Sequence, residues 1–279
     1  MYPYDEHQEF NRYINLDTLE GRILYILVNS RSRHALDLWN MLQYNEANCL
    51  THNADYFKQS SVKSEIPAGV SLSLLTSKSE LNKMIPSVRE KCEDLLEKAW
   101  QAEIKKRWDM VYTGADEASD KKVFLFPFVD DAWKERSARL DIYVDDILPK
   151  DQVVSTVLIG IDIIVHNKIN NITNLSMEDN PAEVQVLYDK DGKPLEEDGE
   201  VVSIPITITK SRVTTMLKSV LAELNGAFVA GVGLMQANQT MSPKCGAKRM
   251  VWNNRDYIGH QVVFGSLMSG VSTVPGVGF

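Results

Sequence analysis

Residues 156–169, TVLIGIDIIVHNKI, form the most apolar run of the sequence, and this run constrains the fold more than any other feature. Every odd-numbered position from 157 to 165 is apolar, whereas the even-numbered positions include Asp162 and His166. Because successive side chains of a β-strand point to opposite faces, the pattern predicts a core strand with one wholly buried face and one partly covered face. We therefore expect a sheet around this strand, with both polar residues on its less buried face.

Helical patterns fill the first part of the chain, from about residue 10 to about residue 112. Asp17 followed by Glu20 has the form of a capping box and predicts a helix that begins there. A second helix is expected after Asn29, and a third, longer one over about 87–111. In each of these segments apolar residues recur three and four positions apart, which is the spacing of one helix face.

Strand patterns dominate from residue 121 to about residue 265. KVFLFPFV is rich in strand formers and is interrupted by Pro127, which suits an edge strand or the end of a strand. RLDIYVDD alternates apolar and polar positions, as a half-buried strand does. Residues 183–208 are expected to form a hairpin-type excursion, and AFVAGVGLMQA and YIGHQVVFGSLM are expected to form the last strand pair.

One amphipathic helix is expected inside this β-rich part, with Ser211 as its cap and Gly226 at its end. Helical patterns followed by strand patterns indicate the α+β class, with a small, mostly antiparallel sheet or barrel packed against this helix. We expect a single domain over residues 1–279. Two segments are expected to extend from it as arms, an insertion at about 45–80 and a tail at 266–279.

Composition argues against several classes of protein. The net charge of -8 is unlike that of a protein that coats nucleic acid, because such proteins carry a basic excess. The sequence holds no run of about 18 apolar residues, so no membrane-spanning helix is expected, and MYPYDEHQEF lacks a secretory pattern. The three cysteines lie far apart and are expected to be reduced thiols, with no cofactor or metal bound.

An alternative interpretation makes the polar residues around the core strand a metal site. Such a site would serve a metal-dependent nuclease or another phosphoryl-processing enzyme. That enzyme also needs a group to polarise the attacking water, and the strand end offers only a poorly placed lysine. We favour the simpler interpretation, a core strand in a protein without catalytic residues. The residues of the alternative site are Asp141, Asp145, Asp146, Asp162 and His166.

A basic stretch near the C-terminus forms a second candidate surface. SPKCGAKR surrounds Cys245 with lysine and arginine, which could lower the pKa of the thiol. No histidine stands nearby in the sequence, so we expect an ordinary loop thiol. The loop could contact an acidic partner, or nucleic acid if the chain is a DNA-binding accessory protein. Its candidate contact residues are Lys244, Lys248, Arg249, Trp252 and Arg255.

Several segments form a series along most of the chain. In order, they are GRILYILVNSRSRHALDLWNML, KVFLFPF, ARLDIYVDD, VLIGIDIIVHNKI, SRVTTMLKSVLAELNG, VAGVGLM and YIGHQVVF. This series resembles the neck, or head-to-tail connector (head completion), proteins of tailed bacteriophages. In that family a helical N-terminal part precedes a strand that ends at a proline. A strand pair whose second member ends in His-Asn follows, and then a helix and a closing strand.

The resemblance implies a non-enzymatic structural protein of the virion neck, made in the host cytoplasm. It implies a homo-oligomeric, twelve-fold ring that contacts the portal protein and adjacent neck or tail proteins. Genomic DNA would pass through the lumen without sequence-specific binding. His166 and Asn167 are then a strand-end feature, in which His166 orients the following loop by a hydrogen bond. The tail is expected to take part in assembly through Val274, Val277 and Phe279.

Overall fold

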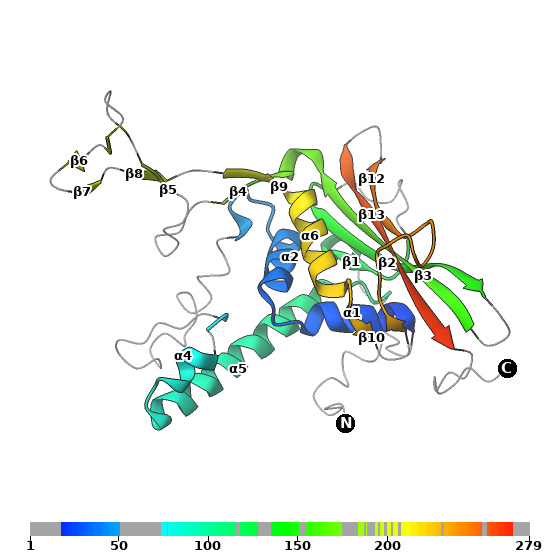
Figure 1. The fold of residues 1–279 in the computed structure, drawn as a ribbon, viewed down its shortest axis with the longest axis horizontal. Helices are drawn as coiled ribbons and strands as arrows, with labels where there is room; N and C mark the ends of the chain where they lie inside the picture. The colour runs from blue at the N-terminus through cyan, green and yellow to red at the C-terminus, as the bar shows by residue number, and fades with distance from the viewer. Residues whose placement is uncertain are drawn as a thin grey trace.

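The computed structural model describes residues 18–50, 74–76, 78–114, 118–127, 135–150, 154–174, 184–186, 188, 193–194, 196–197, 200–201, 203–205, 208–229, 232–252 and 256–269. Within these ranges a five-stranded sheet is covered on one face by helices, and a long helix and a ribbon of short strands extend away from it (Figure 1). The fold is α+β, as the order of helical and strand patterns predicts. The sheet is open, so the barrel alternative is wrong.

The sheet has the strand order β1-β2-β3-β13-β12. Its central strands are β2 (Ala138–Pro149), β3 (Val154–His166) and β13 (Tyr257–Ser269), and each pairs antiparallel with its neighbour. At one edge β12 (Gly246–Trp252) pairs antiparallel with β13, and at the other β1 (Val123–Phe124) pairs parallel with β2. β1 is the short edge strand expected before the proline, and β2 and β3 are the alternating and apolar strands predicted from their patterns.

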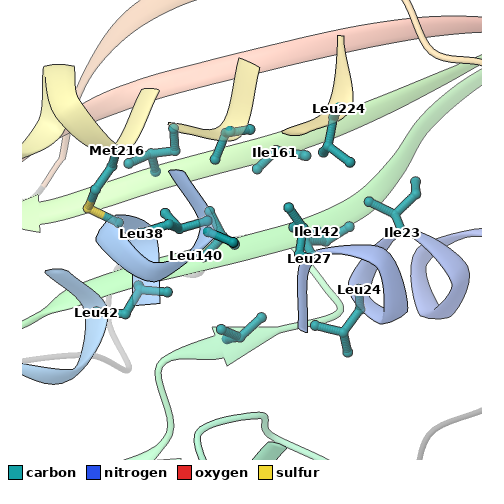
Figure 2. Close-up of a cluster of buried hydrophobic side chains, with 14 of the residues drawn as sticks. Ile23, Leu24, Leu27, Leu38, Leu42, Leu140, Ile142, Ile161, Met216 and Leu224 are labelled. Atoms are coloured by element: carbon teal, nitrogen blue, oxygen red, sulfur yellow. The ribbon is translucent and has the colours of Figure 1, made fainter. Parts of the chain in front are cut away.

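Three helices cover one side of the sheet, here called the helix face, and the opposite side is called the far face. They are α1 (Leu19–Asn29), α2 (Arg33–Gln43) and α6 (Arg212–Leu224). Ser211 Oγ accepts a hydrogen bond from the backbone N of Thr214 and caps α6, as predicted. Figure 2 shows the apolar side chains that meet between these helices and strands β2 and β3. Those labelled are Ile23, Leu24, Leu27, Leu38, Leu42, Leu140, Ile142, Ile161, Met216 and Leu224.

β3 is buried on both of its faces over most of its length. The prediction of a partly covered second face is therefore wrong, and Asp162 on that face is only 5 % exposed. The reason is that side chains from distant segments close over it. Tyr143 of β2 hydrogen-bonds Asp162, and Gln261 of β13 hydrogen-bonds Tyr143 in turn.

The N-terminus of α1 also differs from the prediction. Thr18 is the N-cap, and its Oγ1 accepts a hydrogen bond from the backbone N of Gly21 over 3.1 Å, whereas Asp17 lies outside the described residues. Glu20 instead reaches the sheet, where its Oε1 accepts a hydrogen bond from the backbone N of Val144 over 3.2 Å. The start of α1 is thereby attached to β2.

The long helix α5 (Pro86–Asp109) agrees with the predicted third helix to within two residues at each end. Its buried Arg107 donates hydrogen bonds through Nη1 to the carbonyl oxygens of Val28 (2.9 Å) and Ser30 (2.7 Å), where α1 ends. The last carbonyl groups of a helix lack intrahelical partners, so a cation at this place stabilises α1. Neither α5 nor any other helix in the described ranges is long and apolar enough to cross a membrane.

The last strand pair is not the one predicted. β10 (Phe228–Val229) and β11 (Gly233–Leu234) form a small hairpin of their own. This hairpin is joined to β13 by two backbone hydrogen bonds between Gln236 and Gly265, of 3.0 and 2.8 Å. On the side of β13 away from β3, the pairing strand is β12, which lies in the stretch predicted to be a basic loop.

The two predicted arms are only partly described. In the insertion at 45–80, α4 (Lys78–Asn82) packs on α5, and residues 51–73 lie outside the described ranges. The predicted start of the tail is wrong, because β13 continues to Ser269 and pairs with β3 over this extension. The assembly residues Val274, Val277 and Phe279 lie outside the described residues.

A ribbon of antiparallel strand pairs leaves the body of the molecule near α6 (Figure 1). It corresponds to the hairpin-type excursion predicted from the sequence. From the body outward, its pairs are β4 (Asn171–Asn174) with β9 (Ile208–Ser211), β5 (Val184–Val186) with β8 (Ser203–Pro205), and β6 (Glu196–Glu197) with β7 (Glu200–Val201).

Candidate functional site

Two of the aspartates considered for a metal site face each other across β2 and β3. The register pairs Asp141 with Asp162, so both lie on the far face. The register shifts between Val144 and Asp146, which places Asp145 at a β-bulge, where it is exposed. Among the described residues, no group of three or more His, Cys, Asp or Glu side chains is arranged to hold a metal ion. The alternative site is thus not assembled in this part of the chain.

Asp141 forms a buried ion pair with Arg139, two residues before it on the same strand. Arg139 Nε lies 2.6 Å from Asp141 Oδ1, and its guanidinium lies over the ring of Phe124 at 3.6 Å. Burial raises the pKa of Asp141 to about 7, and the charge of Arg139 opposes this rise. Because Phe124 belongs to β1, the Arg139 side chain also holds this edge strand against β2.

Asp162 is held by hydrogen bonds that cross three strands. The hydroxyl of Tyr143 on β2 donates to Asp162 Oδ1 over 3.1 Å, and Nε2 of Gln261 on β13 donates to the Tyr143 oxygen over 2.7 Å. Burial raises the pKa of Asp162 to about 6, while hydrogen bonds from Tyr143 and Gln261 act in the opposite direction. The partners of Asp162 lie on other strands and far away in the sequence, so the residues around Asp162 in the sequence did not reveal this network. Its buried position fits a role in holding the three strands in register.

Two aromatic rings on the far face lie over glycines of the neighbouring strand. A Cβ added to Gly160 would lie 2.5 Å from the ring of Tyr143. A Cβ added to Gly259 would lie 2.8 Å from the ring of Trp252 and would collide with the carbonyl oxygen of Ile163. Glycine is therefore required at both positions for the rings to lie close to the sheet.

His166 ends β3 and contacts the loop that follows. Its Nδ1 accepts a hydrogen bond from the backbone N of Lys168 over 3.1 Å, which is the kind of contact expected from the sequence. The imidazole packs edge-on against Tyr257, with ring centroids 5.2 Å apart. The backbone N of Asn167 donates to the carbonyl oxygen of Asp256 over 2.8 Å. Burial lowers the pKa of His166, which favours the neutral ring that this hydrogen bond requires.

The basic stretch considered as an interaction loop is mostly the edge strand β12. Lys248 and Arg249 are adjacent on this strand and exposed, and Trp252 at its end is half-buried. Arg255 lies outside the described residues. The prediction of a loop is wrong because β12 pairs with β13 along its whole length, and this pairing is not visible in the local sequence.

Lys244 and Cys245, just before β12, have different surroundings. Lys244 Nζ forms an exposed ion pair with Asp146 Oδ2 at 2.9 Å, and this contact lowers the pKa of Asp146. Cys245 is buried against Leu158 and Val263, and burial raises the pKa of its thiol. The suggestion that its basic neighbours lower this pKa is therefore wrong, and the thiol is not activated as a nucleophile.

Exposed apolar residues gather where the β10–β11 hairpin meets the end of β13. Phe228 and Leu234 are paired across the hairpin and are 76 % and 44 % exposed. Gln236 pairs antiparallel with Gly265, so Leu234, two residues before Gln236, lies beside Leu267, two residues after Gly265. Leu267 is 47 % exposed. Exposed apolar patches of this kind commonly mark a contact surface.

Comparison with known families finds a similarity over part of the chain. Residues 73–180 match the family model YomW, a phage-type family. The matched segment contains α5 and the first four strands, and thus the Asp141–Asp162 pair and His166. No curated protein and no solved structure matches the chain. The chain thus carries a phage-associated domain, which is consistent with a phage protein made in the host.

Proposed function

We propose that this protein is a structural subunit of the phage neck. It forms a twelve-fold ring between the portal and the tail, where it extends or closes the DNA channel, and it catalyses no reaction. In this role the far-face network and the buried core give each subunit a rigid body. The projecting and exposed parts of the chain make the contacts with neighbours.

The observation that carries the proposal is the YomW match over residues 73–180. KVFLFPF, ARLDIYVDD and VLIGIDIIVHNKI, three of the segments that resemble connector proteins, all lie within the matched region. The phage-type family and the resemblance therefore concern the same part of the chain. In the structure this part supplies β1, β2 and β3. They are the edge strand on one side of the sheet, its neighbour and the middle strand.

The ribbon supports assembly into a ring. An isolated pair of strands is at best marginally stable in water, so a ribbon of this length needs a third strand or an apolar surface to pack against. A neighbouring subunit can supply either, and a contact of one surface with a different surface closes into a ring. The apolar patch of Phe228, Leu234 and Leu267 offers a further surface for such contacts.

The proposal is tested first by the composition of the virion. Quantitative mass spectrometry of purified phage particles that encode this chain should find it at the same copy number as the portal protein. Electron microscopy of the same particles should place its density directly below the portal. A chain that is absent from purified particles, or present only in the infected cell, would exclude the proposal.

A second test removes the part of the ribbon beyond β4 and β9 and leaves the body intact. Asn174 and Ile208 are paired at the end of β4 and β9, so residues 175–207 can be replaced by an Asn-Gly turn. This variant should keep the circular dichroism and unfolding cooperativity of the intact chain but should no longer enter particles or form rings. Normal incorporation of the shortened chain would show that the ribbon beyond β4 and β9 is not the assembly element.

A further inference from the structure

The far face of the sheet holds two buried carboxyl groups directly opposite each other. Asp141 on β2 and Asp162 on β3 are paired in register, and antiparallel partners have Cβ atoms about 5 Å apart. Asp141 is 0 % exposed and Asp162 is 5 % exposed. Two ionised carboxylates so close together repel each other strongly in a site that excludes water. The pair therefore needs either enough cations to neutralise it or a bound proton.

The described residues supply one close cation for these two carboxyl groups. Arg139 Nε donates a hydrogen bond to Asp141 Oδ1, and the charge of the same guanidinium lowers the pKa of Asp162. Lys248 also lies on the far face, but it stands beside Gln261, one strand further from Asp141, and it is exposed. With both carboxyl groups ionised, the buried cluster would carry a net negative charge, which is costly away from water.

The other groups around the pair do not supply the missing positive charge. The hydroxyl of Tyr143 is a neutral donor, since burial raises its pKa, and the amide of Gln261 is neutral as well. Phe124, which faces Asp141 from β1, has no charge. Asp145 lies at the β-bulge and adds negative charge, which raises the pKa of Asp162.

The hydrogen bonds indicate which oxygen carries the proton. Asp162 Oδ1 accepts from Tyr143, and Asp141 Oδ1 accepts from Arg139. Asp141 Oδ2, by contrast, is buried and has no hydrogen-bond partner among the residues that the structure describes. A buried acceptor without a donor is costly, whereas the same oxygen with a proton can donate to the carboxylate opposite.

We propose that Asp141 and Asp162 share one proton, which Asp141 Oδ2 carries and donates to the Asp162 carboxylate, and that this bond is a proton-dependent lock between β2 and β3. Hydrogen bonds from a hydroxyl to a carboxylate are short and strong. Loss of the proton leaves two carboxylates face to face and weakens the contact between the two strands. Because Arg139 also holds Phe124, the loosened part includes β1. This inference goes beyond the proposed neck function and does not depend on it.

The direction of the pH dependence follows from the same surroundings. Burial raises the pKa of Asp141 from 3.8 to about 7 and that of Asp162 from 3.8 to about 6. Between about pH 4 and pH 7 the folded state therefore binds more protons than the unfolded state, and the stabilisation by bound protons falls as the pH rises through this range. The lock is closed at pH 6 and open at pH 9.

Carboxyl carbon-13 NMR of the full-length chain, labelled at aspartate, tests where the proton lies. The resonance that is absent from Asp141→Asn should have the position of a protonated carboxyl at pH 6 and that of a carboxylate at pH 9. In Asp162→Asn the same resonance should have the carboxylate position already at pH 6, because the new amide can donate to Asp141 Oδ2. Asp145→Asn, at an exposed residue of β2, is the control and should leave the titration unchanged.

Hydrogen exchange tests whether the proton locks the strands. Protection factors of the β2 and β3 amides should fall about tenfold from pH 6 to pH 9 in the wild type and in Asp145→Asn. Asp141→Asn should keep its protection, because its amide can accept from Arg139 and donate to Asp162 at both pH values.

Three results would overturn the proposal. The first is a carboxylate position for Asp141 at pH 6 in the wild type, which would mean that a buried water or another donor satisfies Oδ2. The second is an Asp141 that stays protonated at pH 6 in Asp162→Asn. The third is an equal loss of protection at pH 9 in the wild type and in Asp141→Asn. None of these results bears on whether the chain is present in virions.

Discussion

Arg212, the first residue of α6, donates a hydrogen bond from Nη1 to the carbonyl oxygen of Met41 over 2.8 Å. The two residues are 171 positions apart, and the bond joins the start of α6 to the end of α2. The same guanidinium also donates to three further carbonyl groups that follow α2, those of Tyr44, Asn45 and Glu46. One buried cation thus serves as the C-terminal cap of α2 and as the link between two helices of the core.

Arg212→Met should destabilise the protein by about 3 kcal/mol, because the buried Met41 carbonyl group and three partly buried carbonyl groups lose their donor at once. The measurement is urea unfolding followed by circular dichroism. Lys218→Met on the exposed side of the same helix is the matched control and should change the unfolding free energy by less than about 0.5 kcal/mol. Equal effects of the two substitutions would show that the cap contributes little.

Arg107→Lys should reduce stability by about 2 kcal/mol although the charge is kept. The planar guanidinium contacts Val28, Ser30 and Glu103 at the same time, and a lysine ammonium cannot reproduce this fork. The shift of the urea midpoint measures the effect, with Lys105→Ala on the exposed face of α5 as the control. An unchanged midpoint for Arg107→Lys would mean that the charge alone is sufficient.

Asp162→Asn should change how stability depends on pH. Burial raises the pKa of Asp162 from 3.8 to about 6, so between these values the folded state binds more protons than the unfolded state. The contribution of this group to stability is therefore greatest at low pH and falls as the pH rises from about 4 to about 6.

The asparagine variant carries no charge, and it can still accept the hydrogen bond from Tyr143. We expect it to be about 1 to 2 kcal/mol more stable than the wild type at pH 8 and nearly equal to it at pH 3. Urea titrations at several pH values measure the difference, with Asp145→Asn as an exposed control on β2. A difference that does not depend on pH would contradict the raised pKa.

Gly259→Ala should destabilise the protein by about 3 kcal/mol or more, because the new methyl group would collide with the carbonyl oxygen of Ile163 on β3. Gly226→Ala is the comparison. Gly226 follows α6 with a φ of 84° and has no atom within 4 Å of an added Cβ, so only backbone strain of about 1 kcal/mol is expected. Thermal unfolding should give Gly259→Ala a clearly lower melting temperature than Gly226→Ala. The reverse order would contradict the close contact between β13 and β3.

Elements with a strong local pattern were predicted well. β3 and α6 have the predicted type and nearly the predicted limits, because period-two and helical patterns of apolar residues arise within each segment. The edge position of β1 also followed from a local signal, the proline after it. The cap of α1 was not predicted correctly from its local pattern, because Glu20 hydrogen-bonds β2 and does not form a capping box with its own helix.

The candidate sites depended on contacts that no local pattern records. β12 was predicted as part of the loop between two strands, yet it pairs with residues 257–263 of β13. Asp162 was expected on a partly covered face, and Tyr143 and Gln261 bury it. The phage-type relationship was visible only as short segments scattered along the chain, and the YomW match concerns three of them.

The sequence by itself determined the α+β class, the apolar core strand and the amphipathic helix, since hydrophobic periodicity sets which face of each element must be buried. The tertiary structure decided which strands pair, which carboxylates are buried and which arginines cap distant helices. These outcomes follow from long-range packing, in which a polar group can be buried once a partner from elsewhere in the chain satisfies it. Arg212 shows the difference: the sequence places it at the start of α6, and only the fold brings it to the end of α2.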